Sequence, residues 1–385
     1  MKFVKAEDLK AGMRLAKPIY NKNGVLLYDR NTVLTAPGIK SVRNFGLIGI
    51  YILEPAEPLP PLSEEDIKFE QLQTVFMFRL RDNLDLIWAR KKMDGLPMFV
   101  EEILRHYGSL DHRVNFNQNL RSAEDFMYKH AISTAILVAM ITSSMAFSHK
   151  KQLSMVTAAL FFGIGYRYVP KTIIEQGNDL TRGDRDIIQQ SLERGLNFLA
   201  MYQNDYDFMP QAVNLCTAYI YSTNPQKALS VDPDMAMMMM ILKIADTFDR
   251  MTAMNLGHEP ESEISAMRFL YQDGRAYHPD IVDKLSECIH IVPSAASVDL
   301  STGSKGIVLV ENPVDFMHPV ILNLDDNQIY DLANPRVSAK MQVLDIMKTM
   351  DNRIFVDEQT RKQFVPDERL RELTKDFRQK LYSKS

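Results

Sequence analysis

Two stretches of this chain are apolar on nearly every helical face, and they restrict the folds it can adopt. "HAISTAILVAMITSSMAF" begins at His130 and "DMAMMMMILKIADTFDRM" begins at Asp234. A helix that is apolar all round has no face suited to water, so we expect each at the centre of a helical bundle. The uncharged run Ala131 to Ser148 carries several Ser and Thr and is short for a membrane span, which favours a buried helix. The sequence thus predicts a mainly α protein that does not span a membrane.

The first residues have a different pattern, with apolar and polar positions alternating around turn signals. The pair Asn23-Gly24 suits a tight hairpin turn, because both residue types tolerate positive φ. A short helix follows, with Thr35 as N-cap and Gly46 as its stop, and then a strand. Residues 1–54 are therefore predicted to form a small α+β domain.

Composition shifts mark the later boundaries. "EPAEPLPPLSEED" holds four prolines in thirteen residues, which is typical of a semi-rigid linker. Short strands with Gly303 in a turn are expected near the C-terminus, followed by a charged amphipathic helix. The predicted segments after the first domain are a linker at 55–66, a helical arm at 67–127, a helical domain at 128–292, a β-rich extension at 293–345 and a charged helical tail at 346–385.

Charge and cysteine content exclude several classes of function. The 45 basic and 49 acidic side chains give a net charge of -4, which creates no basic field for nucleic acid. Cys216 and Cys288 are too far apart for a zinc knuckle and fit a reducing compartment. The N-terminal stretch lacks the apolar core of a signal peptide. We expect a cytoplasmic protein without nucleic-acid partners.

The order of these segments resembles the bacterial HD-GYP proteins, a branch of the HD phosphohydrolases that hydrolyse cyclic di-GMP. "YKHAISTAILVAMI" is similar to the helix with the family's first histidine, His130 here, and "ILKIADTFDRMTA" to the helix with a later aspartate, Asp246. "AALFFGIGYRYVPKTIIEQGNDLT" has the length and punctuation of the stretch that holds the family's His-Asp pair. The resemblance implies an HD-GYP-like helical bundle with a centre of two or three metal ions.

Most of the ligands that the resemblance implies are missing. The His-Asp pair falls on Phe162 and Gly163, and the next family histidine falls on Ser191. The paired histidines and the Gly-Tyr-Pro signature are expected between about Asn214 and Asp232, where no histidine occurs. Such a centre gathers its ligands from several helices, so we expect no catalytic residue, no metal and no cofactor here.

The positions implied for gripping the substrate have also changed. The basic residue of the family's substrate loop falls near Asn255, and a lysine near Gln176. An anionic dinucleotide is held by Arg and Lys side chains, so this loss argues against tight binding. Asp246 and Asp249 share a helical face, where they either hold a weak cation or pair with Arg250 or Lys243.

Two functional hypotheses follow. The first is a catalytically inactive HD-GYP homologue that works as a protein-interaction or scaffold module, with Phe162 and Tyr166 refilling the emptied site. The alternative is a cyclic di-GMP receptor, or a phosphodiesterase with a reduced metal set. The resemblance suggests a diguanylate-cyclase domain or a motility component as partner and leaves a homodimer open.

Overall fold

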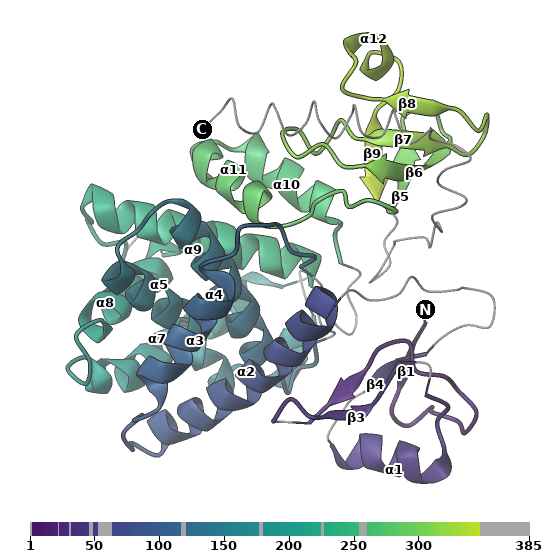
Figure 1. Ribbon diagram of the computed structural model, residues 1–385. Helices are drawn as coiled ribbons and strands as arrows, with labels where there is room; N and C mark the ends of the chain where they lie inside the picture. The colour runs from purple at the N-terminus through teal and green to yellow at the C-terminus, as the bar shows by residue number, and fades with distance from the viewer. Residues whose placement is uncertain are drawn as a thin grey trace.

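The described residues form three parts: a small α+β domain, a large helical body and a five-stranded sheet (Figure 1). This arrangement confirms the expected fold class, a mainly α bundle with an α+β domain before it and a β-rich extension after it. The computed structural model describes residues 2–21, 23–30, 32–45, 49–52, 64–116, 121–176, 180–224, 227–253 and 260–346.

The helical body is built around α4 (Phe126–Ser144), which packs against α2, α3, α5, α9 and α11. By length and hydropathy α4 could cross a membrane, but 83% of its apolar window is buried inside the protein. Its position at the centre confirms the expectation from its all-round apolar pattern. The other helices of the body are α2 (Glu64–Trp88), α3 (Leu96–Tyr107), α5 (His149–Phe161), α6 (Lys171–Ile174), α7 (Arg182–Leu199), α8 (Met209–Ser222), α9 (Pro233–Thr252), α10 (Glu263–Gln272) and α11 (Pro279–Cys288), with the 3-10 turns η1 (Ile164–Tyr168) and η2 (Ala200–Tyr202).

The second apolar stretch, now α9, is less central than its sequence suggested. Ile241, Leu242 and Phe248 are fully buried, whereas Met237 is 45% exposed. The helix therefore presents one face to the core and leaves part of its first turns at the surface. A run of methionines gives no helical periodicity, so the sequence could not distinguish this arrangement from a fully buried helix.

The segment expected to be a helical arm belongs to the main core. Residues 64–66, assigned to the linker from the sequence, form the acidic first turn of α2. The inner faces of α2 and α3 are buried, and Phe76 packs at 5.8 Å from Phe99 between ring centroids. Charged side chains on the outer faces of these helices masked this inner stripe in the sequence.

The N-terminal domain has its own small core. Its elements are β1 (Lys2–Lys5), β2 (Ile19–Tyr20), β3 (Leu26–Tyr28), α1 (Ala36–Asn44) and β4 (Gly49–Ile52), with β1 antiparallel to β4 and β2 antiparallel to β3. Thr35 caps α1 by accepting a hydrogen bond from the Gly38 amide, as expected. In the turn between β2 and β3, Gly24 has φ of +75° while Asn23 has no positive φ, so only one of the two expected positions needs it.

The β-rich extension is a five-stranded antiparallel sheet in the order β8-β7-β6-β5-β9. Gly303, at φ of +84°, turns the chain between the first two strands, as expected. Val298 and Ile321 join the hydrophobic core of the helical body, so the sheet shares that core. The strands are β5 (Ser297–Leu300), β6 (Lys305–Val310), β7 (Val320–Asn323), β8 (Ile329–Asp331) and β9 (Val343–Ile346), and the short α12 (Pro335–Ser338) lies between the last two.

Some sequence-based expectations fall outside the described residues. They concern the helix stop at Gly46, the prolines of the linker, the family position near Asn255 and the charged tail after Ile346.

Candidate functional site

The positions that the resemblance assigns to a His-Asp pair lie at the end of α5. Phe162 is the C-cap of that helix and Gly163 is the N-cap of the 3-10 turn η1. Only 2% of Phe162 is exposed, and its ring meets those of His130 and Tyr219 edge to face at centroid distances of 5.5 and 5.7 Å. Burying an aromatic ring stabilises a fold by about 1.5 to 3 kcal/mol. This position is therefore part of an aromatic core.

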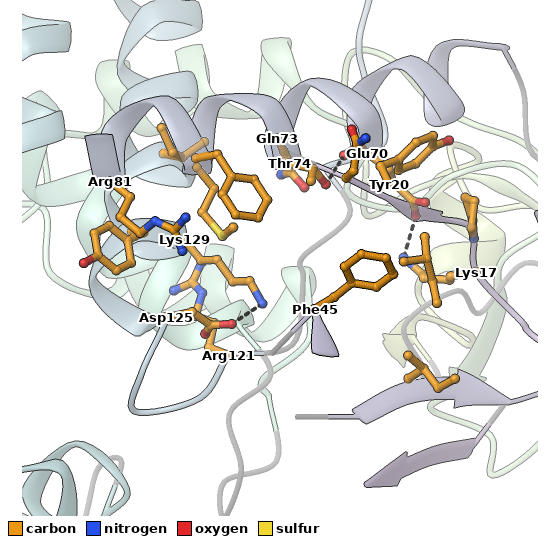
Figure 2. A pocket seen from close by; sticks show the side chains of 18 of the residues that line it. Lys17, Tyr20, Phe45, Glu70, Gln73, Thr74, Arg81, Arg121, Asp125 and Lys129 are labelled. Carbon is orange, nitrogen blue, oxygen red and sulfur yellow. Dashed lines mark hydrogen bonds and ion pairs between the residues drawn. The ribbon is translucent and has the colours of Figure 1, made fainter. Parts of the chain in front are cut away.

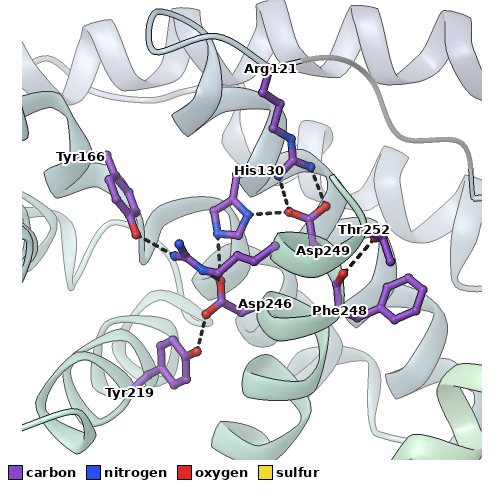
Figure 3. Close-up of polar contacts among 9 residues, drawn as sticks. Arg121, His130, Tyr166, Tyr219, Asp246, Phe248, Asp249 and Thr252 are labelled. Carbon is purple, nitrogen blue, oxygen red and sulfur yellow. Dashed lines mark hydrogen bonds and ion pairs between the residues drawn. The ribbon is translucent and has the colours of Figure 1, made fainter. Parts of the chain in front are cut away.

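His130 projects from α4 between two carboxylates of α9 (Figure 3). Its Nδ1 lies 2.5 Å from Oδ2 of Asp249, and its Nε2 lies 2.9 Å from Oδ1 of Asp246. The ring of Phe126 stacks on the imidazole at 5.3 Å. Only 1% of His130 is exposed; Nδ1 is hydrogen-bonded to Asp249, whereas Nε2 lies near Asp246 without a hydrogen bond of good geometry.

Asp249 is held by an arginine from the loop before α4. The guanidinium of Arg121 donates two hydrogen bonds of 2.6 Å, one to each carboxylate oxygen. The two side chains are 1% and 0% exposed. Such a two-pronged contact combines charge with a fixed planar geometry, which is the arrangement expected for a buried ion pair.

Asp246 is bound by a second arginine and by a tyrosine. Nε of Arg250 donates to Oδ1 over 2.7 Å, while the Tyr219 hydroxyl donates to Oδ2 over 2.6 Å. The same guanidinium donates through Nη2 to the Tyr166 hydroxyl at 2.6 Å. The expected ion pair of Asp246 with Arg250 is therefore present, and Tyr166 contributes through its hydroxyl as well as its ring. Lys243 instead donates to the carbonyl of Ala276.

The network keeps both aspartates ionised despite their burial. Burial alone would raise the pKa of Asp249, but the Arg121 charge and the contacts with His130 lower it to about 2. Burial also raises the pKa of Asp246, but Arg250 and His130 lower it by more, so this pKa lies below the ordinary value. Burial and the neighbouring Asp246 raise the pKa of Tyr219, which remains a donor at neutral pH.

These residues do not fit the metal centre that the resemblance implies. A hard cation needs several oxygen or nitrogen ligands directed at one point. In the described ranges, no group of three or more His, Cys, Asp and Glu side chains could hold a metal ion. Each carboxylate already faces a guanidinium, and Nδ1 of His130 is bound to Asp249.

Comparison with known proteins identifies the region around this network. Residues 116–281 match the family model described as the HD domain. They form an HD domain. The resemblance to HD phosphohydrolases that the sequence suggested is therefore confirmed for the HD domain.

The other two comparisons add little. No curated protein is significantly similar to this chain in sequence. A solved structure of Bd1817, a HDG"Y"P protein from Bdellovibrio bacteriovorus, is similar over 74% of this chain and 97% of its own, with 13% identity and a TM-score of 0.41.

The remaining sequence-derived candidates lie outside the network of the HD domain. Ser191 is buried on α7, where its backbone packs against Gly165. The thiol of Cys216 is buried and donates to the carbonyl of Ala158 at 3.5 Å, and burial raises its pKa, which disfavours the thiolate form. Gln176, near which the resemblance implies a lysine, is exposed after α6.

Two members of the network were missed by sequence reasoning. Tyr219 lies in the stretch where the family's paired histidines are expected, and only the tertiary structure shows that it faces α9. Arg121 lies outside every regular element, and nothing near it in the sequence points to a partner 128 residues further on. Of the two roles expected for Asp246, the ion pair with Arg250 describes the geometry better than a weak cation site.

Proposed function

We propose that this chain is an HD-GYP-type homologue without phosphodiesterase activity, which acts as a protein-interaction or scaffold module in bacterial signalling or motility. The observation that carries the proposal is the pairing of the buried carboxylates of Asp246 and Asp249 with two arginines of the same chain, of which Arg121 is also fully buried. The positive charge that metal ions would supply next to these carboxylates comes from guanidinium groups. The negative charges of the two aspartates are therefore balanced by arginines of the same chain.

The chemistry of phosphodiester hydrolysis supports this conclusion. An HD phosphohydrolase uses its metal ions to generate hydroxide and to neutralise the phosphate. Here Phe162 and Gly163 occupy the positions of the family's His-Asp pair, and the side chain of Phe162 packs against His130. A metal at Asp249 would have to separate that carboxylate from Arg121, which is costly because both side chains are almost completely buried.

A protein partner is the most direct use of a rigid domain that performs no chemistry. The family resemblance suggests a diguanylate-cyclase domain or a motility component. The buried network favours this use because it stabilises the HD domain without a bound metal, so the surface can be presented in all metal conditions. Binding of the purified candidate partner to the full chain, before and after treatment with a chelator, tests this point.

The decisive experiment measures metal, turnover and ligand on the same preparation. Full-length protein expressed with added iron and manganese is analysed by inductively coupled plasma mass spectrometry, assayed for cyclic di-GMP cleavage by chromatography and titrated with cyclic di-GMP by calorimetry. An active HD-GYP phosphodiesterase prepared in parallel is the positive control. We expect no stoichiometric Fe, Mn or Zn, no cleavage and no binding at low micromolar ligand.

Each contrary result has a defined meaning. Two metal ions per chain together with turnover would overturn the inactive assignment. A saturable heat at low micromolar cyclic di-GMP without cleavage would replace the scaffold with a receptor.

A further inference from the structure

A large cavity lies between the N-terminal domain and the helical body, and Arg121 lies in its wall (Figure 2). Its volume is about 740 Å³, within the range of about 300 to 1,000 Å³ typical of small-molecule sites. One wall comes from the N-terminal domain, and the other comes from α2, α4 and the loop that carries Arg121. Pockets at the junction of two domains are frequent ligand sites.

The two walls are held together without a ligand. Lys17 of the N-terminal domain forms a 2.6 Å ion pair with Glu70 of α2, and both side chains are largely buried. The side-chain amide of Gln71 donates to the carbonyl of Gly24, whose Cα lies so close to α2 that an added Cβ would overlap Val75. The cavity is therefore preformed, which reduces the entropic cost of binding.

Aromatic rings line the cavity from both sides. Tyr20, Phe45 and Tyr51 come from the N-terminal domain, and Phe78 and Tyr128 come from the helical body. Phe45 keeps 46% of its surface exposed, which is a large apolar area to leave next to water. Ring faces of this kind are suited to stacking against a planar ligand.

Cationic side chains gather at the end of the cavity formed by the helical body. Arg81 of α2 and Lys129 of α4 both point into it (Figure 2). Lys129 is paired with Asp125 at 2.6 Å, whereas no carboxylate in the described part of the chain lies within ion-pair distance of Arg81. The Arg81 guanidinium lies 4.8 Å from the centre of the Phe78 ring, so a cation and an aromatic face stand together.

We propose that this cavity binds a small anion that carries a planar aromatic ring, with the anionic group at Arg81 and the ring between Phe45 and the aromatic side chains of the opposite wall. A purely apolar ligand would leave the exposed guanidinium of Arg81 without an anionic partner in the site. Inorganic phosphate alone would leave the ring faces in water. Nucleoside monophosphates and aromatic carboxylates share the required chemistry.

The site is independent of the phosphohydrolase centre, because neither Arg81 nor Phe45 belongs to the network around His130. Arg121 lies in the cavity wall and holds Asp249 inside the HD domain, so the two regions adjoin. The proposal goes beyond the proposed function and stands whether or not the chain hydrolyses cyclic di-GMP.

Calorimetric titration of the full-length protein tests the proposal with four probes: AMP, GMP, indole-3-acetate and inorganic phosphate. We expect saturable binding of at least one aromatic anion, and weaker or no binding of phosphate. Comparing AMP and GMP with indole-3-acetate shows whether the site prefers a nucleobase with a phosphate or another aromatic ring with a carboxylate. No saturable heat with any aromatic probe, or equal affinity for phosphate alone, would overturn the proposal.

Two variants locate the site. Arg81→Gln removes the charge and is expected to weaken binding about tenfold, and Phe45→Ala about fivefold. Matched controls are Arg105→Gln, an exposed arginine on α3, and Phe269→Ala, a phenylalanine of 43% exposure on α10. Both controls should bind as the unchanged protein does. Affinity that is the same in all four variants would place the ligand elsewhere and refute the assignment.

Discussion

Replacing Arg121 by methionine tests whether the buried arginine and aspartate act as a matched pair. Arg121 and Asp249 are 1% and 0% exposed and share two hydrogen bonds of 2.6 Å, so solvent screens their attraction little. Removing one partner of a buried pair leaves a charge without compensation, which costs about 3 to 5 kcal/mol. We expect Arg121→Met to lower the free energy of unfolding by about 3 to 5 kcal/mol at pH 7.

Urea unfolding followed by fluorescence measures this loss. The single tryptophan, Trp88, ends α2 within the helical body and reports on the part that contains the pair. Lys171→Met is the matched surface control, because Lys171 binds Glu124 at 2.8 Å while both side chains are more than 60% exposed. An exposed pair of this kind contributes about 0 to 1 kcal/mol.

The double variant Arg121→Met/Asp249→Asn separates the lost charge pairing from lost packing. Asparagine removes the negative charge and keeps an oxygen that can accept a hydrogen bond from His130, so the double variant should be more stable than Arg121→Met alone. A double variant that loses the sum of the two single losses would refute the reasoning, as would a loss below about 1 kcal/mol for Arg121→Met.

The pH dependence of the same variant gives a second check. In the unchanged protein the pKa of Asp249 is lowered to about 2, so its stabilising contribution is present above the unfolded pKa and is lost as the pH falls towards 2. Without Arg121, burial raises the pKa of this carboxyl, and protonation at mildly acidic pH relieves the unpaired charge. The stability gap between the two proteins should therefore narrow as the pH falls from 7 to about 4. A constant gap would contradict the role assigned to charge.

Two further predictions concern other positions. Burial raises the pKa of Glu263 to about 7, so its stabilising contribution is present below the unfolded pKa and is lost as the pH rises through 7. At pH 8, Glu263→Gln should therefore unfold at a higher urea concentration than the unchanged protein. At pH 4.5 the two proteins should unfold at the same urea concentration. An added Cβ at Gly165 would overlap the backbone of Ser191 and Leu192, so Gly165→Ala should cost about 1 to 3 kcal/mol in urea unfolding, while Gly95→Ala, with nothing within 4 Å, should cost less than about 1 kcal/mol.

The helical core was largely accessible from the sequence. The all-round apolar pattern of α4 predicted its central place, and the turn at Gly303 and the N-cap at Thr35 predicted where local elements meet. The role of α2 and α3 was not predicted, because charged outer faces diluted the apolar stripe that joins the common core. Local sequence patterns indicate which residues are buried, but they do not indicate which helix packs against them.

The candidate site divides in the same way. By itself, the sequence determined that Phe162 and Gly163 stand where a His-Asp pair is expected, and that Asp246 has Arg250 one turn away. Only the tertiary structure decided that Arg121 binds Asp249 from 128 residues away, and that two domains enclose a cavity lined with rings and cations. Both depend on side chains from segments distant in the chain meeting in space. Contacts within one helix follow from its 3.6-residue repeat, whereas contacts across the core follow from the packing of all the helices together.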